Sequence, residues 1–203
     1  MTKPKLIYFD MAASRGEECR LALTLAGVEF DDVRIARKDW PTMKPTTPFG
    51  SLPVFELEGH PPLAQSNAIL VLIGRRHGLH PKDDFVAAQH EALMAHVEDL
   101  RAHLAPILRI TDEADKKRVR EELATGYLAT WAGHAEKHLG AGPFVAGDAI
   151  HVVDLKLYMA VRWFKRGTVD HVPTTVFDRF AKLTRLHDAV ADHPRVRAWL
   201  ARH

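Results

Sequence analysis

The chain has little cysteine, little net charge and no long apolar run. Its one cysteine, Cys19, cannot form a disulfide within the chain, and the N-terminus lacks the basic and then apolar pattern of a secretory signal. Both absences favour a reducing, cytoplasmic environment. The best apolar run, residues 68–73, is much shorter than the roughly 20 residues that cross a bilayer, so we expect no membrane span.

The charged residues nearly cancel, because 28 lysines and arginines face 26 acidic residues. Without a concentrated basic tract, nucleic-acid binding is not indicated. The 13 histidines are scattered, and no pair has acidic or thiol neighbours at metal-ligand spacing, so no metal site is expected. A length of 203 residues with 46% hydrophobic and 27% charged residues is typical of a globular protein with one or two domains.

The N-terminal residues predict a strand, a helix and a second strand. Lys5 to Phe9 is a short apolar and aromatic run of strand type. From Arg15, apolar residues recur with helical spacing until Gly27, which suits the left-handed end of a helix. Residues 28–35 alternate as in a strand, and the helical crossover makes this strand parallel to the first.

The following residues predict a long loop and a second pair of strands. Three prolines and Gly50 make residues 36–52 a loop with at most one helical turn. Residues 53–58 and 63–65 have the pattern of two short strands, and Ser66 is the expected cap of a helix that runs to about His77. The expected order of this α/β domain is therefore β-α-β-loop-β-β-α.

Residues 79–84 are polar and contain a proline, and they form the only stretch that resembles a linker. We therefore expect a first domain over residues 1–78 and a second over residues 85–203. The second has helical periodicity and no convincing strand, which predicts an all-α bundle. Its expected helices span residues 85–108, 115–139, 153–165, 176–190 and 194–201.

Three motifs in register carry a family resemblance. They are Trp40 to Pro45, Pro48 to Val54, and Gln65-Ser66. Together with the order of elements, they resemble the cytosolic glutathione transferases over essentially the whole chain, with spacings similar to those of the tyrosine-type classes, sigma above all. The resemblance implies a thioredoxin-like first domain, glutathione as co-substrate and no metal.

The resemblance implies two sets of contacts to glutathione. In that family a cis proline stands at the position of Pro53, and the residue before it, Leu52 here, pairs through its main chain with the cysteinyl part. Ser66 lies where the N-terminus of a helix favours an anion, so Ser66 and Gln65 are expected to bind the γ-glutamyl end. The alternatives are a proline that merely starts a strand, and a helix cap beside a solvated glutamine.

Further contacts are implied from two other places. Trp40 and Lys44 match the family's pair that holds the glycyl carboxylate, although a tryptophan at the core edge and a surface lysine are the alternative. Asp99, on the first long helix of the second domain, stands about where related transferases place an acid that reaches the γ-glutamyl amine bound by the neighbouring subunit. Glu98 and Asp99 could instead form a solvated face.

The group that activates the thiol has two candidates. Tyr8 ends the first strand, where tyrosine-type transferases carry the hydroxyl that hydrogen-bonds to the glutathione sulfur. The segment that follows is one residue longer than in relatives and leaves Ser14 as a rival, because serine-type classes use a hydroxyl near the start of the first helix. Ser14 is also a suitable N-cap with Glu17 at position N3. Arg15 is expected near the sulfur and the electrophile, or only in contact with the loop.

A second departure from the family lies before a later helix. Relatives usually have serine or threonine where His151 stands, as the cap of a buried helix with Asp154 as its partner. Histidine is a poorer cap, and the loss of a good one costs roughly 1 kcal/mol.

The implied activity is the conjugation of glutathione to a small hydrophobic electrophile, as in detoxification, by a cytoplasmic homodimer. One alternative is a glutathione-dependent isomerase or peroxidase, which uses the same thiolate on another acceptor. The other is a non-catalytic structural module that binds glutathione. Cys19 is expected to be a core residue, because the catalytic thiol belongs to glutathione.

Overall fold

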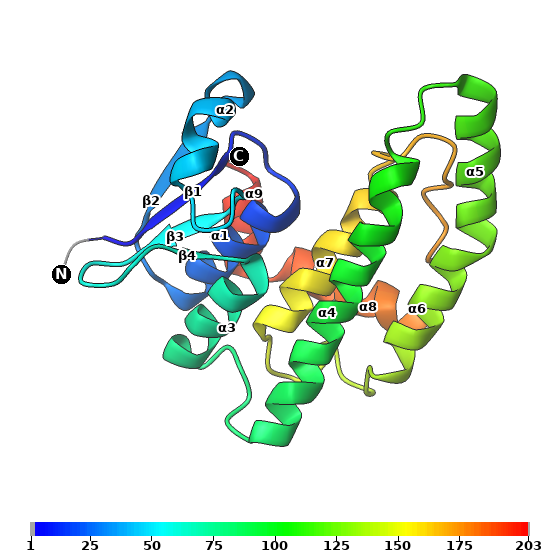
Figure 1. Cartoon of the computed structure of the whole chain (residues 1–203). Coiled ribbons are helices and arrows are strands. Elements are labelled where there is room, and N and C mark those ends of the chain that lie inside the picture. The colour runs from blue at the N-terminus through cyan, green and yellow to red at the C-terminus, as the bar shows by residue number, and fades with distance from the viewer. Residues whose placement is uncertain (1–2, 203) are drawn as a thin grey trace.

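The computed structural model describes residues 3–202, and the chain begins with a four-stranded sheet (Figure 1). The strands are β1 (Lys5–Phe9), β2 (Asp31–Ile35), β3 (Val54–Glu56) and β4 (Leu63–Ala64), in the order β2-β1-β3-β4. β2 runs parallel to β1, as the helical crossover predicts, whereas β3 is antiparallel to β1 and β4 is antiparallel to β3. The predicted α/β first domain is confirmed.

Two helices of this part pack against each other, α1 (Ser14–Ala26) and α3 (Ser66–His77). Gly27 ends α1 with a φ of 68°, a left-handed conformation that glycine adopts without strain. Cys19 lies fully buried in α1, as expected of a core residue. Burial raises the pKa of its thiol, so this thiol is neutral and unreactive at physiological pH.

The long connection between β2 and β3 holds more helix than the sequence predicts. It contains η1 (Arg37–Asp39), α2 (Trp40–Met43) and η2 (Lys44–Thr46), each about one turn long. Prolines stand in the first turns of α2 and η2, where a missing N–H is tolerated. The prolines therefore prevent a long helix here, but two of them lie in the first turns of short helices.

The remainder of the chain is helical, as predicted, although the helix expected from residue 176 begins only at Ala181, after a series of turns. Its helices are α4 (Asp84–Ile107), α5 (Glu113–Thr125), α6 (Tyr127–Lys137), α7 (Val152–Lys165), α8 (Ala181–Asp192) and α9 (Pro194–Leu200). The single helix expected over residues 115–139 is wrong, because Gly126 interrupts it with φ −99° and ψ −90°. Between residues 84 and 202 the structure holds no strand, only two isolated bridges in residues 144–149.

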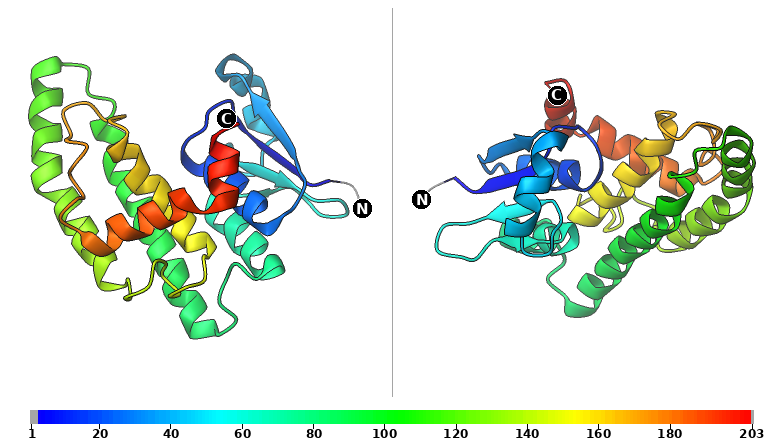
Figure 2. Two further views of the ribbon diagram at one scale, coloured as in Figure 1. Left: turned by 180° about the vertical axis from the view of Figure 1, so that it is seen from behind. Right: turned by 45° about the horizontal axis from the view of Figure 1, so that its top comes forward.

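Helix α7 forms the centre of the helical part and is buried along most of its length. It packs against α1, α4 and α8. At the C-terminus, α9 returns to α1, and both views of Figure 2 place it there. The Trp199 indole N–H donates to Glu17 of α1 over 2.7 Å. The division at residues 79–84 thus remains a prediction, since the last helix packs on the first part. Among residues 3–202, no helix has both the length and the apolar character of a membrane span.

Candidate functional site

The strand register brings three of the predicted site residues to one edge of the sheet. Ile7 pairs with Val54, and Val54 pairs with Ala64. Because both pairings are antiparallel, the next positions across the sheet are residue 8 on β1, residue 53 before β3 and residue 65 after β4. The pairing therefore aligns Tyr8 with the Pro53 and Gln65 positions.

A cleft of about 390 Å³ opens beside Tyr8, between the end of β1 and helices α4 and α7. It is lined on one side by Tyr8, Ser14 and Arg15, so it holds both candidate hydroxyls and the candidate arginine. The apolar side chains on its other sides include Leu100, Leu108, Met159 and Trp163.

Tyr8 is 6% exposed, and its ring packs against the first turn of α1. A Cβ atom at Gly16 would lie 2.1 Å from Cδ1 of this ring, which is a steric clash. Only glycine at position 16 is therefore compatible with this position of the ring. Burial raises the pKa of Tyr8, although the Ser14 hydroxyl and the Arg15 guanidinium oppose the shift. The phenol is therefore protonated near neutral pH and is able to donate a hydrogen bond.

Ser14 begins α1 with a φ of 61°, a left-handed conformation that is uncommon for serine and costs about 1–3 kcal/mol. The expected capping role is wrong, because Ala13 is the N-cap and no side chain caps this helix. Glu17, the expected partner of the cap, instead accepts hydrogen bonds from Arg20 and Trp199. Both Tyr8 and Ser14 line the cleft, so the choice between them as activator stays open.

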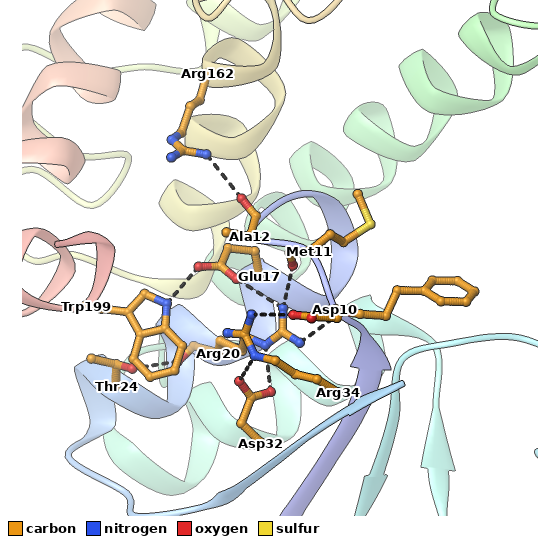
Figure 3. A network of polar contacts seen from close by, with 11 residues as sticks. Asp10, Met11, Ala12, Glu17, Arg20, Thr24, Asp32, Arg34, Arg162 and Trp199 are labelled. Carbon is orange, nitrogen blue, oxygen red and sulfur yellow. Dashed lines mark hydrogen bonds and ion pairs between the residues drawn. The ribbon is translucent and has the colours of Figure 1, made fainter. Parts of the chain in front are cut away.

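One buried arginine holds the loop that joins β1 to α1. Arg20 donates to the carbonyl oxygens of Met11 (2.7 Å) and Phe9 (3.2 Å), as Figure 3 shows for Met11. Its own position is set by ion pairs with Glu17 (3.2 Å) and Asp32 (2.7 Å). Because Arg20 is fully buried, these contacts fix the path of the chain between the two candidate hydroxyls.

Two further arginines contact the same loop from outside α1 (Figure 3). Arg34 of β2 pairs with Asp10 over 3.2 Å. Arg162 of α7 reaches the Ala12 carbonyl oxygen over 3.4 Å. The loop is thus tied to the sheet on one side and to the helical part on the other.

Arg15 lines the cleft but is held by an acid of α4. Its guanidinium donates two hydrogen bonds to Oε2 of Glu98, at 2.6 and 2.9 Å. Glu98 also pairs with Arg101 (2.8 Å) and with Lys156 of α7. Burial opposes ionisation, but these three cations lower the pKa of Glu98 to about 2, so it is a carboxylate at neutral pH. Glu98 therefore lies in a network of ion pairs and does not form a solvated face together with the exposed Asp99, which is the alternative prediction.

Of the predicted glutathione residues, Pro53 has the cis peptide bond that the resemblance implies. The Leu52–Pro53 peptide bond is cis, and Gln65 has a φ of 71°. Gln65, rather than Ser66, is the N-cap of α3, and its side chain makes no capping bond. Ser66 is therefore the first residue of the helix, 4% exposed, and its Oγ accepts a hydrogen bond from Lys156 over 3.0 Å.

Of the predicted site residues within residues 3–202, only Tyr8, Ser14 and Arg15 line the cleft. Trp40 is half-buried, and its ring meets the edge of Phe9 at 5.8 Å between centroids. Lys44 is exposed, and its side chain lies against Gly50. Asp99 is exposed on α4 and does not line the cleft, so its predicted role depends on a partner subunit.

Sequence reasoning missed Glu18, Arg101 and Lys156. Lys156 and Glu18 are fully buried and 3.1 Å apart, and Arg101 pairs with Glu18 as well. The available signal was a lone lysine within the apolar run of residues 155–161. Among residues 3–202, no group of histidine, cysteine or acidic side chains is arranged to hold a metal ion.

Comparison with known proteins identifies the family. A model of the N-terminal domain of glutathione S-transferases matches residues 4–75, and a model of their C-terminal domain matches residues 98–203. The chain is 32% identical over 206 residues to glutathione S-transferase 1 of Ascaris suum, across 99% of this chain and 97% of that protein. The solved glutathione S-transferase of Ascaris lumbricoides has 32% identity and a TM-score of 0.87, with 99% and 97% of the two chains covered. Prostaglandin synthase D of Nilaparvata lugens has 28% identity and a TM-score of 0.86, with 100% and 98% covered. The chain belongs to the glutathione S-transferase family.

Proposed function

We propose that glutathione binds along the sheet edge formed by Tyr8, Pro53 and Gln65, with its sulfur facing the cleft. The chain is a glutathione transferase, and glutathione is its co-substrate. The single observation that carries the proposal is the strand register, which aligns these three positions along one edge of the sheet, with Tyr8 also lining the cleft.

Each part of the co-substrate has a matching group. The main chain of Leu52, before the cis bond, pairs with the cysteinyl backbone in the manner of an added strand. Ser66 and the free N–H groups at the start of α3 bind the γ-glutamyl carboxylate together with Gln65. Trp40 and Lys44 hold the glycyl carboxylate through an indole N–H and an ammonium group.

The Tyr8 hydroxyl donates a hydrogen bond to the sulfur and thereby favours thiolate over thiol. A thiol with a pKa of about 8.5 is only a few per cent ionised at neutral pH, so complete ionisation raises the reactive fraction about thirtyfold at most. A larger acceleration comes from holding an electrophile against the sulfur in the cleft. Ser14, beside Tyr8, is the alternative activator.

We also propose a homodimer in the cytoplasm. Phe49 and Phe85 are 67% and 74% exposed, which is unusual for phenylalanine and is consistent with surfaces covered by a second copy. In such a dimer Asp99 reaches the γ-glutamyl amine bound by the partner subunit. Light scattering during gel filtration tests this assembly, and a monomer would remove the role of Asp99.

The function is tested by glutathione calorimetry and by turnover of 1-chloro-2,4-dinitrobenzene in Tyr8→Phe and Ser14→Ala variants. We expect Tyr8→Phe to lower kcat/KM about tenfold or more and to raise the apparent pKa of the bound thiol, while Ser14→Ala has the smaller effect. A Tyr8→Phe variant with unchanged activity and pH profile would exclude Tyr8. Tight glutathione binding without turnover of electrophiles, isomerisable substrates or peroxides would indicate a non-catalytic module.

A further inference from the structure

The cleft is strongly cationic for a site expected to take a hydrophobic electrophile. Five arginines line it, and no aspartate or glutamate is among the lining residues of the described chain. The arginines are Arg15, Arg37, Arg101, Arg162 and Arg166.

Two of these five arginines are neutralised by acids outside the lining. Arg15 pairs with Glu98, and Arg101 pairs with both Glu98 and Glu18. The positive charges of Arg15 and Arg101 are therefore balanced within the protein. The charges of Arg37, Arg162 and Arg166 remain to be explained.

The other three have no carboxylate partner within residues 3–202. Arg162 contacts the Ala12 carbonyl oxygen at 3.4 Å, a long hydrogen bond, and the Tyr158 hydroxyl. Arg37 lies over the ring of Phe9, 5.5 Å from its centroid. Arg166 forms no ion pair and is exposed. Three positive charges thus face one cleft without compensation.

Their spacing suits one shared anion. Arg162 lies in the last turn of α7, and Arg166, four residues later, is the C-cap of this helix. The Arg166 backbone N–H donates to the Arg162 carbonyl oxygen over 3.0 Å, so the two residues lie one turn apart on the same side of the helix end. Arg162 is half-buried and Arg166 is exposed, which places charge both inside the cleft and toward solvent. Between them on the chain, Trp163 adds an apolar surface to the same cleft.

We propose that the electrophile of this enzyme is an amphipathic anion, with an apolar body and a carboxylate or similar acidic group. The apolar body contacts Leu108, Met159 and Trp163, and the acidic group binds Arg162 and Arg166. Guanidinium groups bind carboxylates with paired N–H donors, and such bonds are stronger in a partly buried site. This inference rests on the proposed function, because it concerns the second substrate of the same reaction.

The reaction itself is a displacement. The glutathione sulfur attacks the carbon that bears the leaving group and forms a C–S bond. The leaving group departs with the electron pair of its own bond, and the thiol proton passes to solvent. The arginines take no part in this step, since they bind the remote anionic group and orient the electrophile.

The rival explanation is that the free arginines attract glutathione, which is itself an anion. Arg37 is the arginine nearest in sequence to Trp40 and Lys44, the proposed glycyl site. The test therefore measures the two substrates separately, and it relies on Arg162 and Arg166 rather than on Arg37.

The test compares 4-chloro-3,5-dinitrobenzoate with its methyl ester, two electrophiles that share the reacting carbon and differ in charge. Each kcat/KM is divided by the uncatalysed rate constant with glutathione, so that intrinsic reactivity cancels. We expect Arg166→Met and Arg162→Met each to lower the ratio of benzoate to ester by about tenfold, and the double variant to lower it further. Arg166→Lys keeps most of the preference, because it retains the charge.

Lys117→Met is the matched control, since it removes one cation from the exposed face of α5. We expect no change in the ratio for this variant, and KM for glutathione within about twofold of wild type in all variants. Equal losses on both electrophiles, or a rise confined to KM for glutathione, would overturn the proposal and leave the transferase function intact. If the wild type turns over 1-chloro-2,4-dinitrobenzene but neither of these two electrophiles, the proposal alone is overturned. Absence of turnover of all three would overturn the proposed function as well.

Discussion

Lys156 of α7 donates a hydrogen bond of 3.0 Å to Oγ of Ser66, although the two residues are 90 positions apart in the sequence. The lysine side chain is fully buried, and its ammonium group also contacts Glu18 (3.1 Å) and Glu98. All three of its N–H donors can therefore be satisfied by oxygen atoms. Because the Ser66 oxygen accepts this bond, the hydroxyl proton is free to be donated to a ligand.

Substitution of Lys156 by methionine should strongly destabilise the fold. Methionine fills similar space but leaves the buried Glu18 carboxylate with Arg101 alone, and breaking a buried ion pair typically costs about 3–5 kcal/mol. Urea unfolding measures the free energy directly. Lys117→Met, which also loses one cation but from an exposed position, should change it by less than about 1 kcal/mol.

A second variant separates loss of charge balance from loss of packing. In the double variant Lys156→Met with Glu18→Gln, the buried acid is removed together with its cation. We expect the loss of unfolding free energy in the double variant to be smaller than the sum of the losses in the two single variants, by roughly 0.5–3 kcal/mol. Strict additivity would show that the ion pair contributes nothing.

The features predicted correctly from the sequence are those set by neighbouring residues. The sheet strands follow from short apolar runs and their turns, and the end of α1 follows from Gly27. The cis Leu52–Pro53 bond is equally local, because it involves two adjacent residues. The binding of glutathione by Leu52, Gln65 and Ser66 stays a prediction.

The features that sequence reasoning missed depend on distant contacts or on one ambiguous residue. Glu18 and Lys156 meet only after the two parts of the chain pack together. Gly126 is compatible with a helix interior as well as with a break, and tertiary packing decides between them. Serine is a residue type that often caps helices, so Ser14 is a reasonable prediction for the cap. Arg20, however, holds the preceding loop through the Met11 carbonyl oxygen, and Ala13 is the N-cap.

Gly16→Ala should reduce activity at least as much as removal of the Tyr8 hydroxyl. A Cβ at residue 16 would lie 2.1 Å from Cδ1 and 2.8 Å from Cβ of Tyr8, so the ring must move as a whole. We expect kcat/KM with glutathione and 1-chloro-2,4-dinitrobenzene to fall about tenfold or more. Stability should fall as well, by roughly 1–3 kcal/mol.

Gly133→Ala is the control for this change, because Gly133 also lies inside a helix. A Cβ there meets its nearest atom, in Phe180, at an ordinary 3.8 Å. This variant should retain full activity and gain roughly 0.5–1 kcal/mol from the better helix propensity of alanine. Equal activity of the two variants would show that the Tyr8 ring is free to shift without consequence.

His151→Thr should stabilise the protein by restoring a cap to α7. Asp154 already accepts hydrogen bonds from the backbone N–H groups of His151 (2.7 Å) and Val145 (2.8 Å). His151 has the position of a capping-box residue opposite Asp154, but within residues 3–202 its buried Nδ1 has no hydrogen-bond partner. A threonine hydroxyl would accept from the helix N–H and contribute about 1 kcal/mol, which raises Tm by about 2–4 °C in a protein of this size. His151→Ala, which adds no cap, should not raise Tm, and an equal gain from alanine would contradict the capping argument.

His90 makes the stability of the fold sensitive to acid. Its ring is 3% exposed on α4, and its centroid lies 5.3 Å from that of His151 and 6.4 Å from that of His80. Burial and these two neighbours lower the pKa of His90 to about 4. In the unfolded chain the pKa of histidine is about 6.5, so between these values the unfolded state binds a proton that the folded state does not.

The free energy of unfolding is therefore fully retained above about pH 6.5 and falls as the pH drops toward 4, by about 1–2 kcal/mol between pH 7 and pH 5. His90→Gln keeps a polar side chain of similar length that does not titrate in this range. The loss of unfolding free energy between pH 7 and pH 5 should therefore be about 1–2 kcal/mol smaller in this variant than in the wild type. Urea unfolding at the two pH values gives the comparison. His60→Gln, in an exposed turn, should leave the acid loss as in the wild type. If His90→Gln loses as much stability as the wild type on acidification, the sensitivity belongs to other groups, and the buried His90 imidazole does not set it.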